Sequence, residues 1–229
     1  MTRLAVLILL FAFACKSDNK QVENHKEQQQ DTSRIKNREP FDLQVRKYED
    51  PKRQTWQDPK FVIEALGDLN NLIVADIGSG TGYFTFQMAV PAEKVIAIDI
   101  EQRFLNYIED RKSEMYDRQL AGKIETRLTT PDTPSLEESE VDVVLMVNTI
   151  AYINDREDYL GKLRKGMNRG GRIIIVDYKV GKMPVGPHEN FKVTEKELIN
   201  TLKKTGFKVE IIDNESLQYQ YLIKATNSN

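Results

Sequence analysis

The chain has 229 residues, a formal net charge of −2, and 40% hydrophobic residues. This length and composition suit one globular domain of ordinary core size with some additional chain. The near-neutral charge argues against a bulk nucleic-acid partner, which requires a clustered basic surface. A single cysteine excludes intrachain disulfides and thiolate metal sites, and two histidines far apart in sequence, His25 and His188, give no basis for a zinc site.

Residues 1–15 have the pattern of an export signal. Arg3 is followed by an uncharged apolar run at residues 4–14 and then by Cys15. The run is too short to span a bilayer but suits the hydrophobic region of a signal peptide. Residues 12–15 resemble the bacterial lipobox, whose cysteine becomes lipidated. We therefore expect a membrane-anchored bacterial lipoprotein with a lipidated Cys15; an uncleaved apolar N-terminus, and hence a cytoplasmic protein, is the alternative.

Residues 16–40 are predicted to be a disordered linker, because polar and charged side chains dominate and too little apolar surface is present to offset the entropy of ordering. The folded domain is predicted to span residues 41–229. Its first clear helix signal is Asp58-Pro59, in which the aspartate caps the helix and the proline suits its first turn. Arg53 and Trp56 precede this helix. They either line the entrance to a substrate site or, for Trp56, pack the helix onto the core.

The segment Val-Ala-Asp-Ile-Gly-Ser-Gly-Thr-Gly-Tyr, residues 74–83, organises the domain. An apolar run at residues 72–77 predicts a strand, the glycines predict a tight turn, and residues 83–90 can form a helix. This order places free backbone N–H groups at a helix N-terminus, where they can bind an anionic or polar ligand. The alternating glycines allow a sharp turn and a close approach by that ligand.

A second apolar run, residues 95–98, ends in Asp99, about 20 residues after the first glycine of the turn. An acidic side chain at this place can accept hydrogen bonds from both hydroxyls of a bound ribose. The dinucleotide-binding fingerprint G-x-G-x-x-G would require glycine at position 83, which is Tyr83. A nicotinamide-dependent oxidoreductase is therefore disfavoured.

The rest of the domain alternates helices and strands. Strand 141–147 is almost wholly apolar, as in a buried parallel sheet, and is followed by Asn148 and Tyr152. Ligands of open α/β sheets bind beyond the carboxyl ends of the strands, so both residues are expected to face the site. The other predicted elements are a helix from Gln102 to about Leu120 ended by Gly122, a strand at 124–128, a helix from Asn154 closed by Gly170-Gly171, a strand at 173–176, a helix capped by Thr194, and closing strands at 207–212 and 217–223.

The pattern D-x-G-x-G-x-G at residues 76–82 resembles motif I of the class I S-adenosylmethionine (SAM)-dependent methyltransferases, and the element order of residues 47–225 is similar to theirs. The resemblance implies an α/β fold: a Rossmann-like, mostly parallel seven-stranded sheet with helices on both faces and an antiparallel last strand. It also implies SAM as cofactor. The glycine loop would pack against the methionine part of SAM, and Asp76 or a nearby carbonyl would accept a hydrogen bond from its ammonium group. Asp99 would bind the ribose. Asp132, in the turn at 129–134, would contact the adenine. The cofactor-binding residues expected in full are Asp76, Gly78, Ser79, Gly80, Thr81, Gly82, Tyr83, Asp99, Asp132 and Asn148.

In such enzymes the methyl group passes from a sulfonium to the acceptor by direct SN2 displacement, and a general base is needed only if the acceptor must lose a proton. Tyr152 and His188 are candidates by position. The acceptor is expected to be a small molecule or a membrane-associated compound. The tetrapeptide [Asp/Asn]-Pro-Pro-aromatic, which is the best local signature of base and glutamine-amino methyltransferases, is missing. No metal is expected, and the oligomeric state is not specified.

Export would separate the protein from SAM, which is made in the cytoplasm. The alternative hypothesis is therefore a membrane-anchored module that keeps a nucleoside or SAM pocket without turnover. The intact Asp76, glycine turn and Asp99 favour the enzyme.

Overall fold

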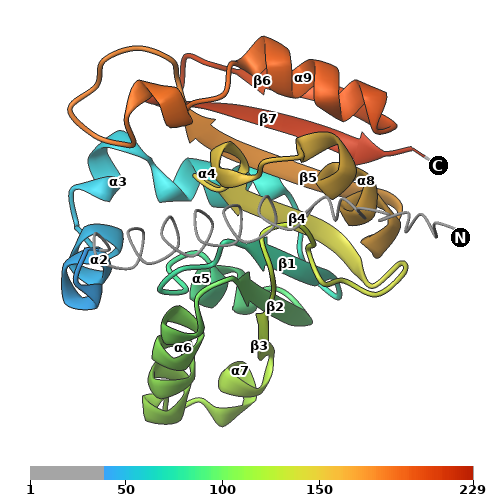
Figure 1. The fold of residues 1–229 in the computed structure, drawn as a ribbon. Coiled ribbons are helices and arrows are strands. Elements are labelled where there is room, and N and C mark those ends of the chain that lie inside the picture. Colours follow the sequence, from blue (N-terminus) through green and yellow to red (C-terminus); the bar gives the residue numbers. More distant parts are fainter. Residues whose placement is uncertain (1–38, 229) are drawn as a thin grey trace, which may run out of the picture. The chain divides into compact units, whose positions relative to one another are not determined.

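The computed structural model describes residues 39–228, in which seven strands form one sheet with the order β3-β2-β1-β4-β5-β7-β6 (Figure 1). Strands β1 to β5 are parallel, and β7 is antiparallel to both of its neighbours. This confirms the predicted Rossmann-like architecture. The strands are β1 (Ile73–Ile77), β2 (Lys94–Asp99), β3 (Ile124–Leu128), β4 (Val141–Val147), β5 (Met167–Tyr178), β6 (Phe207–Asp213) and β7 (Gln220–Asn227). The expected signal peptide and nearly all of the expected linker lie outside the described residues.

Helices cover both faces of the sheet. Helices α4, α5 and α6 pack on one face, and α8 and α9 pack on the other. The helices are α2 (Phe41–Tyr48), α3 (Arg53–Trp56), α4 (Pro59–Leu66), α5 (Thr85–Ala89), α6 (Gln102–Glu114), α7 (Arg118–Gly122), α8 (Arg156–Gly166) and α9 (Glu195–Lys204), with 3-10 turns η1 (Ile150–Tyr152) and η2 (Glu189–Phe191). None of the helices in this part of the chain is long and apolar enough to cross a membrane.

The central strands are apolar on both faces because both faces are covered. In β1, Ala75 and Ile77 belong to the core cluster under α8 and α9, whereas Val74 belongs to the cluster under α4 and α5. Alternate side chains of a strand point to opposite faces, so a nearly continuous apolar run fills both cores. Packing on both faces thereby fixes the positions of the carboxyl ends of these strands.

Helix starts follow their capping residues. Asp58 accepts a hydrogen bond from Phe61 N (3.1 Å) at the start of α4, and Thr194 accepts one from Glu197 N (3.1 Å) at the start of α9. Both starts were predicted from sequence and are confirmed. The cap of α8 is Asp155 and not Asn154, since the Asp155 carboxylate accepts from Asp158 N (3.0 Å).

Other predicted boundaries are also wrong. The helix predicted from Gln102 to about Leu120 is two helices, because the chain becomes extended at Met115 and the side chain of Asp117 caps α7. Helix α8 ends at Gly166, and Gly170-Gly171 lie inside a longer β5. A Cβ at Gly171 would lie 2.9 Å from the carbonyl oxygen of Asp142 in β4. Glycine at this position therefore allows β5 to approach β4 closely.

The last strand begins at Gln220, three residues later than predicted, and continues to Asn227. The Asp213 carboxylate accepts hydrogen bonds from Glu215 N (3.0 Å) and Ser216 N (2.9 Å) and extends the turn before it. The carboxyl ends of β1, β2, β4 and β5 lie at one edge of the sheet, and the candidate site lies along that edge.

Candidate functional site

The glycine turn connects β1 to the region of α5 and is bonded to the neighbouring strand. The backbone N–H groups of Gly78 and Ser79 donate to the carbonyl of Ile98 (2.8 and 3.1 Å). Gly78, with a φ of +74°, lies so close to Thr149 that a Cβ there would be 2.2 Å from the Thr149 hydroxyl oxygen. Any side chain at position 78 would therefore be both strained and in collision.

Two hydroxyl groups of the turn have no hydrogen-bond partner in the described part of the chain. Ser79 Oγ and Thr81 Oγ1 are both buried and unpaired. An unsatisfied buried hydroxyl costs about 1–3 kcal/mol, which a polar ligand group at the turn would recover. Gly80 lies directly against the ring of Tyr48, because a Cβ at this position would come within 3.1 Å of that ring. The turn thus fits a polar, chain-like group such as the methionine part of SAM.

Asp99 ends β2 directly beside the turn. It is 8% exposed, and its two carboxylate oxygens accept hydrogen bonds from Gly80 N (2.8 Å) and Glu101 N (2.9 Å). Burial raises the pKa of Asp99, and the bond from Gly80 N opposes that shift. Each carboxylate oxygen has a second acceptor site, so a pair of ribose hydroxyls can still donate to it. Asp99 lies at the carboxyl end of β2, as expected, and its contact with a ribose remains a prediction.

Asp76 lies beneath the turn and is 3% exposed. Thr85 Oγ1 donates to its carboxylate (2.6 Å), which ties the end of β1 to the first residue of α5. Burial raises the pKa of Asp76 to about 6. In this structure Asp76 joins strand and helix, and its contact with a methionine ammonium remains a prediction.

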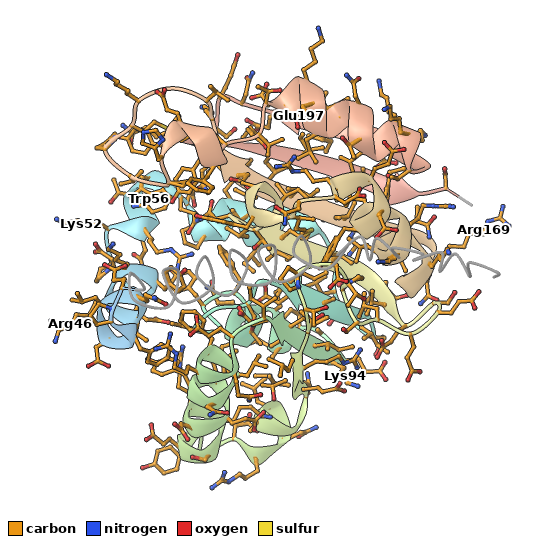
Figure 2. The ribbon with its side chains drawn as sticks, in the orientation of Figure 1. Arg46, Lys52, Trp56, Lys94, Arg169 and Glu197 are labelled. Carbon is orange, nitrogen blue, oxygen red and sulfur yellow. The ribbon has the colours of Figure 1, made fainter. Side chains whose placement is uncertain are left out.

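Aromatic rings border the same edge of the sheet. The ring of Trp56, which projects from α3, stacks on Tyr178 at the end of β5 with centroids 5.9 Å apart (Figure 2). The ring of Tyr152, in η1, stacks on Phe191 with centroids 6.3 Å apart. Tyr152 and Phe191 are 58% and 53% exposed, so this pair presents apolar surface to solvent. The Trp56 contact supports the packing interpretation and also places the ring at the edge.

Asn148 follows β4 with a φ of +56° and is held across the sheet. Its backbone N–H donates to the carbonyl of Val176 (2.8 Å), and its side-chain oxygen accepts from Gln220 Nε2 of β7 (2.5 Å). Tyr152 follows four residues later. Burial, and after it the charge of Asp177, raises the pKa of Tyr152.

Asp132 and His188 are both exposed. The Thr130 hydroxyl donates to the Asp132 carboxylate and lowers its pKa, and the Asp132 carbonyl accepts from Lys162 Nζ of α8 (2.9 Å). This loop is joined to the site through Thr129, whose N–H donates to the Asp99 carbonyl (3.0 Å). The carbonyl of His188 accepts from Phe191 N (2.9 Å).

Two residues at the edge were not assigned a role from sequence. Asp177 is buried at the end of β5, accepts from Tyr178 N (2.7 Å), and has a pKa raised to about 6 by burial. Its position, an aspartate ending an apolar strand as Asp99 does, was a readable signal. Thr149 packs against Gly78, and no sequence pattern predicts this contact.

Within residues 39–228, no group of histidine, cysteine and carboxylate side chains could hold a metal ion.

A family profile described as a methyltransferase domain matches residues 68–226. The chain belongs to the class I SAM-dependent methyltransferase family. For this family SAM is the cofactor, and the unpaired hydroxyls, the glycine turn and Asp99 fit it. The nicotinamide-dependent alternative is wrong.

Relatives and solved structures agree with this assignment. The methyltransferase-family chain is 25% identical over 152 residues to a demethylmenaquinone methyltransferase of Tropheryma whipplei strain Twist, covering 66% of this chain and 57% of that protein. It is 24% identical over 169 residues to a ubiquinone/menaquinone biosynthesis C-methyltransferase of Ectopseudomonas mendocina, covering 72% of this chain and 62% of that protein. The chain therefore spans less than two thirds of the length of these relatives. A SAM-dependent methyltransferase from Aquifex aeolicus shares the fold, with a TM-score of 0.73, 21% identity, and coverage of 82% of this chain and 99% of that one.

Proposed function

We propose that this protein transfers the methyl group of SAM to a small, apolar, ring-containing acceptor by direct displacement. The observation that carries the proposal is the exposed aromatic pair Tyr152–Phe191 beyond the carboxyl edge, next to the end of the strand that carries Tyr178. A stacked pair with this much solvent-exposed apolar area is suited to a flat hydrophobic molecule. The Trp56–Tyr178 pair extends the apolar border of the same edge.

When bound, SAM would supply a methyl group on a positively charged sulfur; the sulfur would keep the electron pair of the broken C–S bond, and the acceptor atom would supply the pair of the new bond. The chain's own residues orient the two reactants. The glycine turn and Asp99 fix the position of the nucleoside and methionine parts, and the aromatic border excludes water from the acceptor. Holding two reactants in such an alignment removes a large part of the entropic barrier to their reaction.

The role of Tyr152 is better described as hydrogen-bond donation than as a general base. The ordinary pKa of a tyrosine lies well above 7 and that of Tyr152 is shifted upward, so the phenol is neutral near pH 7 and has little tendency to take a proton. A neutral phenol can orient an oxygen atom of the acceptor. His188, exposed on the connection between β5 and α9, is kept as a candidate base that the experiment below can test.

The names of two relatives support a quinone-like acceptor, since one is named for demethylmenaquinone and the other for ubiquinone and menaquinone biosynthesis. Such rings are flat and apolar, which matches the exposed aromatic pair. Acceptors of this kind reside in membranes, and the sequence pattern of residues 1–15 supports an anchored protein. Incorporation of labelled palmitate that requires Cys15 would support the anchor, whereas a soluble, unlabelled protein would contradict it.

Calorimetric titration of the full chain with SAM, S-adenosylhomocysteine and NAD tests the cofactor part, with Asp99→Ala as the control. We expect binding of the two adenosyl ligands, no binding of NAD, and loss of binding in the variant. Transfer of label from SAM to a naphthoquinol then tests the acceptor class, with His188→Gln beside the wild type. Binding without transfer to any apolar acceptor would favour the alternative, an anchored module without turnover.

A further inference from the structure

Arg53 is a buried cation without a carboxylate partner. It is 9% exposed, its Nε donates to Gln57 Oε1 (2.7 Å), and its Nη1 donates to the carbonyl of Tyr48. Both partners are neutral. Glu49, which influences it electrostatically, is paired instead with Arg111 (3.4 Å), and no ion pair to Arg53 exists among residues 39–228.

The aromatic neighbours of Arg53 offset only part of the cost of this burial. The guanidinium carbon lies 4.3 Å from the ring centroid of Tyr83 and 5.7 Å from that of Phe84. Cation–π contacts of this kind are modest next to the penalty for an unpaired charge taken out of water. Burial lowers the pKa of Arg53, because removal from water disfavours the charged form. A guanidinium nevertheless stays protonated in proteins. A retained but unpaired buried cation indicates that its anion arrives with a ligand.

The surroundings of Arg53 identify where that anion lies. Tyr83 directly follows the glycine turn, and Tyr48, whose carbonyl Arg53 binds, has its ring beside Gly80. The charge of Arg53 also acts on Asp76, beneath the same turn. The guanidinium therefore borders the turn that holds the two unpaired hydroxyls, Ser79 Oγ and Thr81 Oγ1. Guanidinium and hydroxyl donors together match a carboxylate, which can accept several hydrogen bonds at once.

We infer that Arg53 binds the α-carboxylate of the methionine part of SAM, with the turn hydroxyls as neighbouring donors. This inference rests on the proposed function, because it requires SAM at the turn. The α-carboxylate is the one anionic group that SAM carries, so it is the group that completes the missing ion pair. Helix α3 would then contact the cofactor through Arg53, its first residue, and the acceptor border through Trp56, its last residue.

The test compares two ligands that differ only in this carboxylate: S-adenosylhomocysteine and its decarboxylated analogue, S-adenosyl-3-thiopropylamine. Both are titrated by calorimetry into the full-length wild type, Arg53→Met, Arg53→Lys and Arg169→Met. Arg169 is exposed at the opposite end of the sheet from Trp56 and is the matched control (Figure 2). We expect the wild type to prefer the carboxylated ligand by about 10- to 100-fold, the range of a charge-assisted hydrogen bond.

In Arg53→Met we expect that preference to disappear while the affinity for the decarboxylated analogue stays within about threefold of the wild type. Arg53→Lys should keep part of the preference, and Arg169→Met all of it. Equal weakening of both ligands in Arg53→Met, or no weakening, would overturn the inference. Arg53→Met is used only if it unfolds cooperatively, as a folded protein does. The wild type alone also tests the inference, which is overturned if the wild type binds both ligands equally well. A folded wild type that binds neither ligand refutes the proposed function itself.

Discussion

Three buried aspartates end or nearly end strands at the site, and their partners give them different roles. Asp99 accepts from the glycine turn, Asp76 from Thr85 in α5, and Asp177 from the backbone N–H of Tyr178, the last residue of β5. The sequence allows all three to be placed at the carboxyl edge, because each follows or closes an apolar run. It does not give the hydrogen-bond partners, which depend on turn geometry, and so it does not separate the ligand-binding carboxylate from the structural ones.

Asp99→Asn should weaken binding of S-adenosylhomocysteine by about 10- to 100-fold. The amide keeps one acceptor oxygen but presents an NH2 group to one of the two backbone donors, Gly80 N or Glu101 N. The free energy of unfolding should also fall, by about 1–3 kcal/mol. Calorimetry and urea unfolding measure the two effects. Unchanged affinity in the folded variant would show that the ribose is bound elsewhere.

Asp76 should make the free energy of unfolding depend on pH. Its folded pKa is about 6, above the ordinary value, because burial disfavours the charged form. Between the two values the folded state binds more protons than the unfolded state, so the stability from this group is present at low pH and lost as pH rises through 6. Relative to Asp76→Asn, which does not titrate, the wild type should lose about 2.5 kcal/mol between pH 4 and pH 7.5. Urea unfolding at several pH values measures it, and a pH-independent difference between the two proteins would contradict it.

At the scale of elements, the sequence predicted helix and strand types well and several boundaries poorly. Capping residues such as Asp58 and Thr194 marked true starts because their bonds are local. The end of α8 was misplaced because Gly170-Gly171 resemble a helix stop, whereas both lie within β5 and Gly171 is needed for the close approach of β4 and β5. That need is created by tertiary contact, which no local pattern contains.

Gly78→Ala should destabilise the glycine turn by at least about 2 kcal/mol. The new Cβ meets the Thr149 hydroxyl oxygen at 2.2 Å, and the residue must also keep a φ of +74°. Adding Thr149→Ala removes the oxygen and the methyl group but not the backbone strain. The double variant should therefore recover part of the loss, with a coupling of about 1 kcal/mol or more in a double-mutant cycle. Strictly additive effects would mean that strain alone, and not the contact, requires glycine.

Asp58 should tolerate glycine better than alanine. Its carboxylate caps α4, and removing an N-cap oxygen costs about 1 kcal/mol. Its φ of +42° adds strain for alanine that glycine does not have. The unfolding midpoints should rank wild type, Asp58→Gly and Asp58→Ala from highest to lowest. An alanine variant as stable as the glycine variant would show that the backbone at this position relaxes freely.

At the scale of the whole molecule, the strand order explains why one edge collects the site. The chain moves from β1 toward β2 and β3 on one side and later from β4 to β5 on the other, so the ends of β1 and β4 flank the point where the connections diverge. Open α/β sheets bind ligands at this point. Alternation of apolar strands and helices was enough to predict it. The aromatic border was not predictable, because Trp56, Tyr152 and Phe191 come from three connections whose meeting is set by the fold.

Ligand binding should stabilise the whole domain, and Trp56 should report it. Because the cofactor binds only the folded state, S-adenosylhomocysteine at 100 times its Kd should raise the free energy of unfolding by about 2.7 kcal/mol, and NAD at the same concentration should not. Trp56 is the single tryptophan of the chain and stacks on Tyr178. Its fluorescence therefore follows unfolding and should also change when an apolar acceptor occupies the border. Stabilisation by S-adenosylhomocysteine without any fluorescence response of Trp56 to a naphthoquinol would contradict the acceptor proposal. Equal stabilisation by NAD would contradict the cofactor selectivity.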